Sequence, residues 1–157
     1  MRYMKYMIKG LNPNNFYDIA KLSLNGYRGK IYSSYSNKVH IAAAMEWLCA
    51  AQKQTGDFGV SAMYSLFEGW LPSYIETTGY IIPTFFNYAE HEKNEAYRKK
   101  AVEMADFELN NQLESGAFPG AGGKANPSVF NTGQVIFGLC RTFEETKDEK
   151  YMNAAKK

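Results

Sequence analysis

From residue 37 to the end of the chain, apolar residues recur at intervals of three and four, the spacing of one face of an α-helix. Helical patterns follow one another at residues 37–55, 76–91, 94–113, 129–146 and from about 148 onward. In the first of them Asn37 is the expected N-cap, and one face is formed by Ile41, Ala44, Leu48 and Ala51. The second pattern is apolar nearly all round and the fourth over a broad face, which indicates burial, whereas the others are amphipathic. The sequence therefore predicts an all-α fold in which buried inner helices alternate with partly solvated outer helices.

The connections between the predicted helices are of two kinds. Short turns follow the inner helices, whereas long Gly-containing stretches at residues 57–75 and 115–127 lead from the outer helices into the inner ones. Connections of this length inside a compact domain are usually functional. Residues 1–36 have a weaker pattern, with a turn signal at 12–15 and a short helix at 17–24, and are predicted to form a separate, partly helical N-terminal segment.

The helical part of the chain is an internal repeat. Some residues recur 60 positions later and others 54 positions later: Trp47, Gln52, Gly56 and Phe58 as Phe107, Gln112, Gly116 and Phe118; Thr78 and Gly79 as Thr132 and Gly133; Tyr97 and Ala101 as Tyr151 and Ala155. The first repeat covers about 37–93, the second 94–147, and a third begins at 148 and stops at 157. Such a period is typical of stacked supersecondary units. We therefore expect a partial α/α toroid, with two repeats and the start of a third, as a fragment of a longer array.

An incomplete ring of helices exposes the apolar side of its inner helices at the open edge, which isolated soluble domains rarely tolerate. We therefore expect further repeats, or a second copy of the chain in a homo-oligomer, to cover this edge. A monodisperse monomer at high concentration would contradict the expectation.

Composition and charge narrow the range of partners. The chain has a net charge of +2 and no tract of Lys or Arg, which disfavours nucleic acid as a partner. Its longest apolar run is far too short to span a bilayer, and no signal-peptide core follows its basic first residues, so a cytoplasmic location is expected. Cys49 and Cys140 lack the spacing of a metal site, and His40 and His91 stand alone. We therefore expect buried free thiols, surface histidines, no metal and no cofactor.

The candidate chemistry lies where the inner helices begin. Glu76 opens one inner helix and is surrounded in sequence by the aromatic residues Trp70, Tyr74 and Tyr80, an arrangement common in sugar sites. With Asp57, at the start of the long loop, Glu76 would form a pair of carboxylates able to act as general acid and base at a glycosidic or epimerisable centre. Glu76 is equally explained by the preference for acids in the first turn of a helix, and Asp57 more simply as an ordinary loop residue.

Polar and aromatic residues around the two inner-helix N-termini complete the candidate site, because free backbone N–H groups there favour polar ligand groups. The proposed ligand contacts are Trp70, Tyr74, Thr77, Thr78, Tyr80, Tyr64, Asn131 and Gln134. For the threonines, helix capping takes precedence over ligand contact. The expected partner is a glycan or another small-molecule ligand.

Two stretches of the chain resemble a known family. One comprises the run from Trp47 to Gln52, Gly56-Asp57-Phe58-Gly59 and Ser73-Tyr74-Ile75-Glu76-Thr77-Thr78-Gly79-Tyr80-Ile81-Ile82-Pro83-Thr84; the other runs from Gly116 to Gly120 and from Val129 to Leu139. They resemble the prenyltransferase and squalene-oxidase repeat proteins of the α/α-toroid superfamily, and within it a bacterial branch often linked to polysaccharide biosynthesis. The resemblance covers roughly residues 40–157 and implies an α/α toroid that binds or acts on a glycan.

The chain departs from this family in several places. The branch usually has Asp-Gly-Gly where this chain has Asp57-Phe58-Gly59, and Tyr-Pro-Glu where it has Tyr74-Ile75-Glu76, which alters backbone freedom at the candidate site. The acidic signature of squalene-type cyclases and the zinc ligands of protein prenyltransferases are absent from the sequence. These absences argue against terpene cyclisation and prenyl transfer.

Three functions follow from the residues and the resemblance. The first is a glycan-binding or glycan-modifying protein of polysaccharide biosynthesis, and the second is a non-catalytic scaffold or binding module. The third is an isoprenoid-binding enzyme. Two carboxylates that face each other across aromatic side chains would support an enzyme. A single carboxylate among aromatic side chains would support a binding protein. A deep, dry aromatic cavity would support an isoprenoid site.

Overall fold

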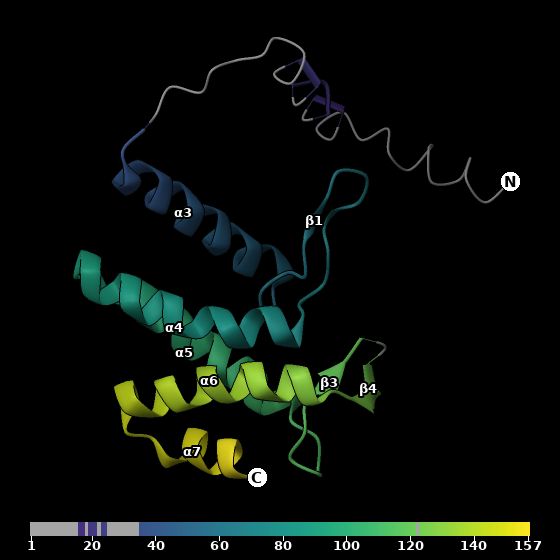
Figure 1. Ribbon diagram of the computed structural model, residues 1–157, viewed down its shortest axis with the longest axis vertical. Helices are drawn as coiled ribbons and strands as arrows, with labels where there is room; N and C mark the ends of the chain where they lie inside the picture. Colours follow the sequence, from purple (N-terminus) through teal and green to yellow (C-terminus); the bar gives the residue numbers. More distant parts are fainter. Residues whose placement is uncertain (1–15, 18, 22, 25–34, 122) are drawn as a thin grey trace, which may run out of the picture.

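The computed structural model describes residues 16–17, 19–21, 23–24, 35–121 and 123–157 (Figure 1). In this part of the chain the fold is all-α, with two short antiparallel strand pairs inserted before two of the helices. The described residues between 16 and 24 are helical, as the sequence predicts. The turn expected at 12–15 lies outside the described residues.

The helices of the repeats begin and end close to their predicted bounds. They are α3 (Asn37–Thr55), α4 (Ile75–Glu92), α5 (Glu95–Asn111), α6 (Val129–Thr146) and α7 (Glu149–Lys156). α3 ends at the predicted place because Gly56, with φ 73°, adopts the left-handed conformation that terminates helices. The N-cap of α3 is Ser36, one residue before the expected Asn37, and its side chain makes no capping hydrogen bond.

The turn after each inner helix has the same construction in both repeats. Lys93 and Lys147, with left-handed φ values of 53° and 60°, end α4 and α6. The next residue in each case begins an outer helix, because the side chains of Asn94 and Asp148 each accept a 3.0 Å hydrogen bond from the backbone N–H two residues on. The internal repeat seen in the sequence therefore extends to these backbone conformations and caps.

Each inner helix is preceded by a short strand pair. β1 (Tyr64–Ser65) pairs with β2 (Gly69–Trp70), and β3 (Pro119–Gly120) pairs with β4 (Gly123–Pro127). Figure 1 shows both pairs at the same end of the molecule, beside the N-terminal ends of α4 and α6. The sequence predicts only loops here, because most of these strands are too short to show an alternating pattern.

The core of the protein lies around α4, which packs against both α5 and α6. Ile82, Phe85 and Phe86 of α4 are fully buried. α6 in turn packs against α7, so the two inner helices lie side by side and the outer helices α5 and α7 lie against them. This arrangement agrees with the predicted alternation of inner and outer helices. Closure into a toroid stays a prediction.

Two glycines set the distance between α4 and α6. A Cβ atom at Gly79 would lie 2.7 Å from the Cα atom of Val135, and one at Gly138 would lie 2.5 Å from the carbonyl oxygen of Gly79. Side-chain carbons do not approach backbone atoms so closely, so a larger residue at either position would push the helices apart. The inner helices therefore meet backbone to backbone.

α3 is covered mainly toward its C-terminal end. Its buried residues are Met45, Ala51 and Gln52, whereas Ile41 and Ala44, which were expected on its packed face, are exposed. Figure 1 shows the reason, since α3 comes nearest to the other helices at the end that leads into the β1–β2 loop. The prediction of one continuous packed face on this helix is therefore wrong for its first turns.

Candidate functional site

A pocket of about 320 Å³ lies between the two loops that lead into the inner helices. Its walls come from the loop before α4, from the C-terminal end of α5 and from β3. The lining residues are Asp57, Pro72, Ser73, Tyr74, Ile75, Phe107, Asn111, Pro119, Gly120 and Ala121. Of the residues predicted from the sequence, Asp57 and Tyr74 are therefore brought into one pocket.

The Asp57 carboxylate is fixed at the pocket by the two ends of its own loop. Its Oδ1 atom accepts a hydrogen bond from the backbone N–H of Gly59 (3.0 Å) and another from the hydroxyl of Ser73. The other carboxylate oxygen, Oδ2, makes no hydrogen bond to any described residue. The Oδ1 atom of Asp57 thus connects the two ends of the loop, and its Oδ2 atom can accept a hydrogen bond from a ligand.

Tyr74 connects the pocket to the second inner helix. The side-chain amide of Asn131, which is buried at the start of α6, donates to the carbonyl oxygen of Pro119 (2.8 Å) and to the Tyr74 hydroxyl (3.4 Å). Asn131 is therefore a positioning residue behind the pocket wall, and the lining residues of the pocket do not include it.

Phe107 and Asn111 are contributed by α5, where they stand one helical turn apart. The Phe107 ring packs on the loop so tightly that a Cβ atom at Gly59 would lie 2.7 Å from a ring carbon. The Asn111 amide donates a 2.8 Å hydrogen bond to the carbonyl oxygen of Phe107. Neither residue stands out in the sequence as a site residue, although the repeat places the Phe107 ring at the position of Trp47.

Thr78 and Thr132 attach the loops to the inner helices. The Thr78 hydroxyl accepts a hydrogen bond from the backbone N–H of Val60 and donates one to the carbonyl oxygen of Tyr74, both 2.8 Å. In the second repeat, Thr132 accepts from Phe118 N (2.9 Å) and donates to the carbonyl one turn earlier. The helix-capping role expected for these threonines is therefore wrong, because the N-caps of α4 and α6 are Tyr74 and Ser128. The two hydroxyls instead bind the backbone of the preceding loops.

Other predicted site residues lie outside the pocket. Glu76 and Thr77 are half-buried and Tyr80 is exposed on α4, while Gln134 is half-buried on α6. No described residue forms a hydrogen bond or ion pair with the Glu76 carboxylate. Glu76 does not line the pocket that holds Asp57, so the two carboxylates are not brought together in that pocket.

Trp70 and Tyr64 belong to an aromatic cluster with Trp47 of α3. Tyr64 and Trp70 stand opposite each other in the β1–β2 pair, with ring centroids 5.1 Å apart. The Trp47 ring lies 4.6 Å from that of Trp70 and is inclined to it by 46°. This cluster packs α3 against the hairpin and does not line the pocket.

One carboxylate is fully buried without a partner. Glu108, on α5, has 0% of its surface exposed, and neither of its carboxyl oxygens has a hydrogen-bond partner among the described residues. Burial raises the pKa of Glu108 well above its usual value and so favours the neutral form of the side chain. In the first repeat the same position is occupied by Leu48. Glu108 does not stand out in the sequence, because the rest of α5 is amphipathic and rich in charged residues.

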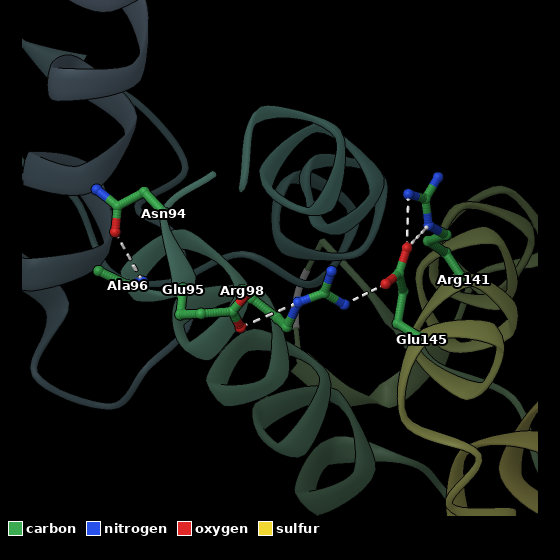
Figure 2. A network of polar contacts seen from close by, with 6 residues as sticks. All are labelled: Asn94, Glu95, Ala96, Arg98, Arg141 and Glu145. Carbon is green, nitrogen blue, oxygen red and sulfur yellow. Dashed lines mark hydrogen bonds and ion pairs between the residues drawn. The ribbon is translucent and has the colours of Figure 1, made fainter. Parts of the chain in front are cut away.

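An ion-pair network joins α5 to α6 near the N-terminal end of α5 (Figure 2). Glu145 of α6 pairs with Arg98 of α5 and with Arg141 one turn earlier on its own helix (2.7 Å). Arg98 also contacts Glu95 at 3.2 Å. Burial by itself raises the pKa of Glu145, but the hydrogen bonds from both arginines outweigh burial and lower it. The network is a structural clamp between an outer and an inner helix.

The described residues contain no group of three His, Cys, Asp or Glu side chains arranged to hold a metal ion. Cys49 and Cys140 are free thiols and are half-buried, not buried as expected; His40 and His91 are exposed. Among the described helices, none combines the length and the apolar character needed to cross a membrane.

No protein-family model, no curated protein and no solved structure matches this chain. The pocket itself is therefore the basis for inferring a function. It combines two aromatic rings with a carboxylate, a hydroxyl and an amide, which is a set suited to a small polyhydroxylated ligand.

Proposed function

We propose that the pocket binds a sugar unit of a glycan and that the protein serves as a glycan-binding protein of polysaccharide biosynthesis in the cytoplasm. The main support is the placement of Phe107 and Tyr74 in one pocket with Asp57, Ser73 and Asn111. Sugar rings have C–H faces that pack on aromatic rings, and hydroxyl groups that bond to carboxylate and amide groups. The volume of about 320 Å³ suits a ligand as small as a single sugar ring.

The number of carboxylates favours binding over glycoside hydrolysis. Hydrolysis of a glycosidic bond generally uses two carboxyl groups, about 5 Å apart in retaining enzymes and about 6.5–9.5 Å apart in inverting ones. The pocket is lined by one acid, Asp57, and Glu76 is not among its lining residues. One oxygen of Asp57 is already engaged by two donors, which suits a carboxylate that holds a ligand in place.

The polar groups among the lining residues of the pocket favour a glycan over an isoprenoid. An isoprenoid chain offers no hydrogen-bonding groups, so its binding would desolvate the Oδ2 atom of Asp57 without giving it a partner, at a cost in free energy. The resemblance of residues 40–157 to a branch linked to polysaccharide biosynthesis supports the same ligand class.

Binding of the full chain to an array of neutral and acidic oligosaccharides tests the proposal, followed by titration calorimetry on the best ligand. Asp57→Asn keeps an oxygen that can accept from Gly59 and Ser73 but removes the charge, so we expect about tenfold weaker binding. Glu76→Gln is the matched control, the same acid-to-amide change outside the pocket, and should bind as the unmodified protein does.

The reverse result, with binding or turnover lost in Glu76→Gln and retained in Asp57→Asn, would overturn the assignment of this pocket. Absence of binding to every oligosaccharide on the array would overturn the ligand class.

A further inference from the structure

The interface between the inner helices α4 and α6 shows how two inner helices pack against each other. On α4, Gly79 lies directly against Val135 of α6. In the second repeat, 54 residues later, Gly133 occupies the same position on α6. Because an α-helix turns by about 100° per residue, Gly133 and Val135 lie on opposite sides of α6. The side of α6 that carries Gly133 therefore corresponds to the side of α4 that carries Gly79 and packs against α6.

This second side of α6 has no neighbour in the described part of the chain. Nothing lies within 4 Å of a Cβ atom placed at Gly133. Val129 and Phe137, one turn before and one turn after it, are 93% and 64% exposed, and Cys140 on the same side is half-buried. An exposed apolar surface of this kind marks an interaction site in a soluble protein.

The same surface is uncharged and complementary to itself. From Val129 to Cys140, α6 contains no Asp, Glu, Lys or Arg, so two copies can approach without like-charge repulsion or the desolvation of charges. The empty position at Gly133 and the exposed ring of Phe137 are separated by one helical turn. A two-fold axis between them would place each ring over the empty position of the other molecule.

We propose that the protein forms a two-fold symmetric dimer in which α6 packs antiparallel against α6 of a second copy, with each Phe137 ring over the opposing Gly133. Such an interface uses the same patch on both molecules, as in the commonest class of homodimer. The second copy then supplies an apolar group against Gly133, as Val135 does against Gly79 inside the protomer. This dimer covers the open edge of the helical array and does not depend on the ligand of the pocket.

Sedimentation equilibrium of the full chain over a range of concentrations up to about 1 mM tests the proposal. We expect a monomer–dimer equilibrium in which Phe137→Glu raises the dissociation constant about tenfold or more. Gly133→Leu should do the same, because its side chain fills the position that the opposing ring would occupy. Phe67→Glu, a matched change of an exposed Phe in the β1–β2 loop, should leave the constant unchanged.

Circular dichroism checks that the two α6 variants are folded, and both should retain the helical signal of the unmodified protein. If the protein is a monomer at every concentration, the proposal is overturned. This side of α6 would then be the binding surface for an inner helix of another repeat. A dimer that persists unchanged in both Phe137→Glu and Gly133→Leu also overturns it.

Discussion

The side-chain amide of Gln112, at the end of α5, donates a 2.7 Å hydrogen bond to the backbone carbonyl of Ala154 in α7. In the first repeat, Gln52 of α3 donates in the same way to the carbonyl of Lys100 in α5, at 3.2 Å. A single glutamine thus joins each outer helix to the next. Each glutamine also donates to a carbonyl of the loop after its own helix: Gln112 to that of Gly116, and Gln52 to that of Phe58.

Gln52→Leu is expected to lower the free energy of unfolding by about 2 kcal/mol, because the carbonyl groups of Phe58 and Lys100 both lose their donor. Lys100 also loses the side-chain oxygen to which its Nζ atom donates at 3.1 Å. Urea unfolding monitored by circular dichroism measures the change. Lys53→Leu, the next residue along and solvent-exposed, is the control, and an equal effect of both changes would contradict the role given to Gln52.

Phe58→Gly is expected to raise the free energy of unfolding by about 0.5–1 kcal/mol, because an L-residue other than Gly is strained at positive φ. Phe58 has φ 73° and is 57% exposed, so little packing is lost with its ring. Phe118→Gly, at the equivalent position of the second repeat, removes a fully buried ring and should lower stability by about 3–5 kcal/mol. Thermal unfolding of both variants distinguishes strain from packing.

Glu108→Leu is expected to raise the free energy of unfolding at pH 7 by about 1–3 kcal/mol, since it removes an unsatisfied buried carboxyl group. The raised pKa of Glu108 means that the folded protein binds a proton that the unfolded chain releases. Its contribution to stability therefore declines as pH rises above about 4.3, the usual pKa of Glu.

Glu108→Gln should abolish this part of the pH dependence while leaving a polar side chain in place. Urea unfolding between pH 4 and pH 8 compares the two variants with the unmodified protein. If the slope of stability against pH were the same in all three proteins, Glu108 would not be the group responsible.

Equivalent glycines of the two repeats are expected to respond to alanine in opposite directions. Gly79→Ala places a Cβ atom 2.7 Å from the Cα of Val135 and should destabilise the protein by about 1–3 kcal/mol. Gly133→Ala meets nothing within 4 Å and should stabilise the protomer by about 0.5–1 kcal/mol through helix propensity. Chemical unfolding at low protein concentration isolates the protomer. Destabilisation of similar size by both changes would contradict the open position at Gly133.

The helices of the repeats could be predicted from the sequence because their signals are local. Gly56 marks the end of α3, and Asp148 the start of α7. The exposure of Ile41 could not be predicted, because an apolar position on a helix does not reveal whether another element reaches it. The same limit applies to Val129, which lies in the apolar pattern of α6 and is almost fully exposed.

The candidate site was only partly predictable for the same reason. Asp57 and Tyr74 stood out because they lie in or beside a long loop with aromatic residues. Phe107 and Asn111 reach the pocket from the C-terminal end of a helix whose pattern indicates an ordinary outer helix. Sequence spacing brought Glu76 close to Tyr74, but the first turn of α4 carries Glu76 out of the pocket wall.

The loops are anchored to the inner helices through backbone atoms: Thr78 holds the N–H of Val60, and Thr132 holds the N–H of Phe118. An anchor of this kind does not depend on which side chains the loop carries. Substitutions at loop positions outside the core can therefore accumulate without loosening the helical frame, whereas Val60 and Phe118 are buried in it. The ligand preference of the pocket can thus change while the helices keep their arrangement. The same property makes the two loops natural segments to exchange or randomise when new binding specificities are engineered.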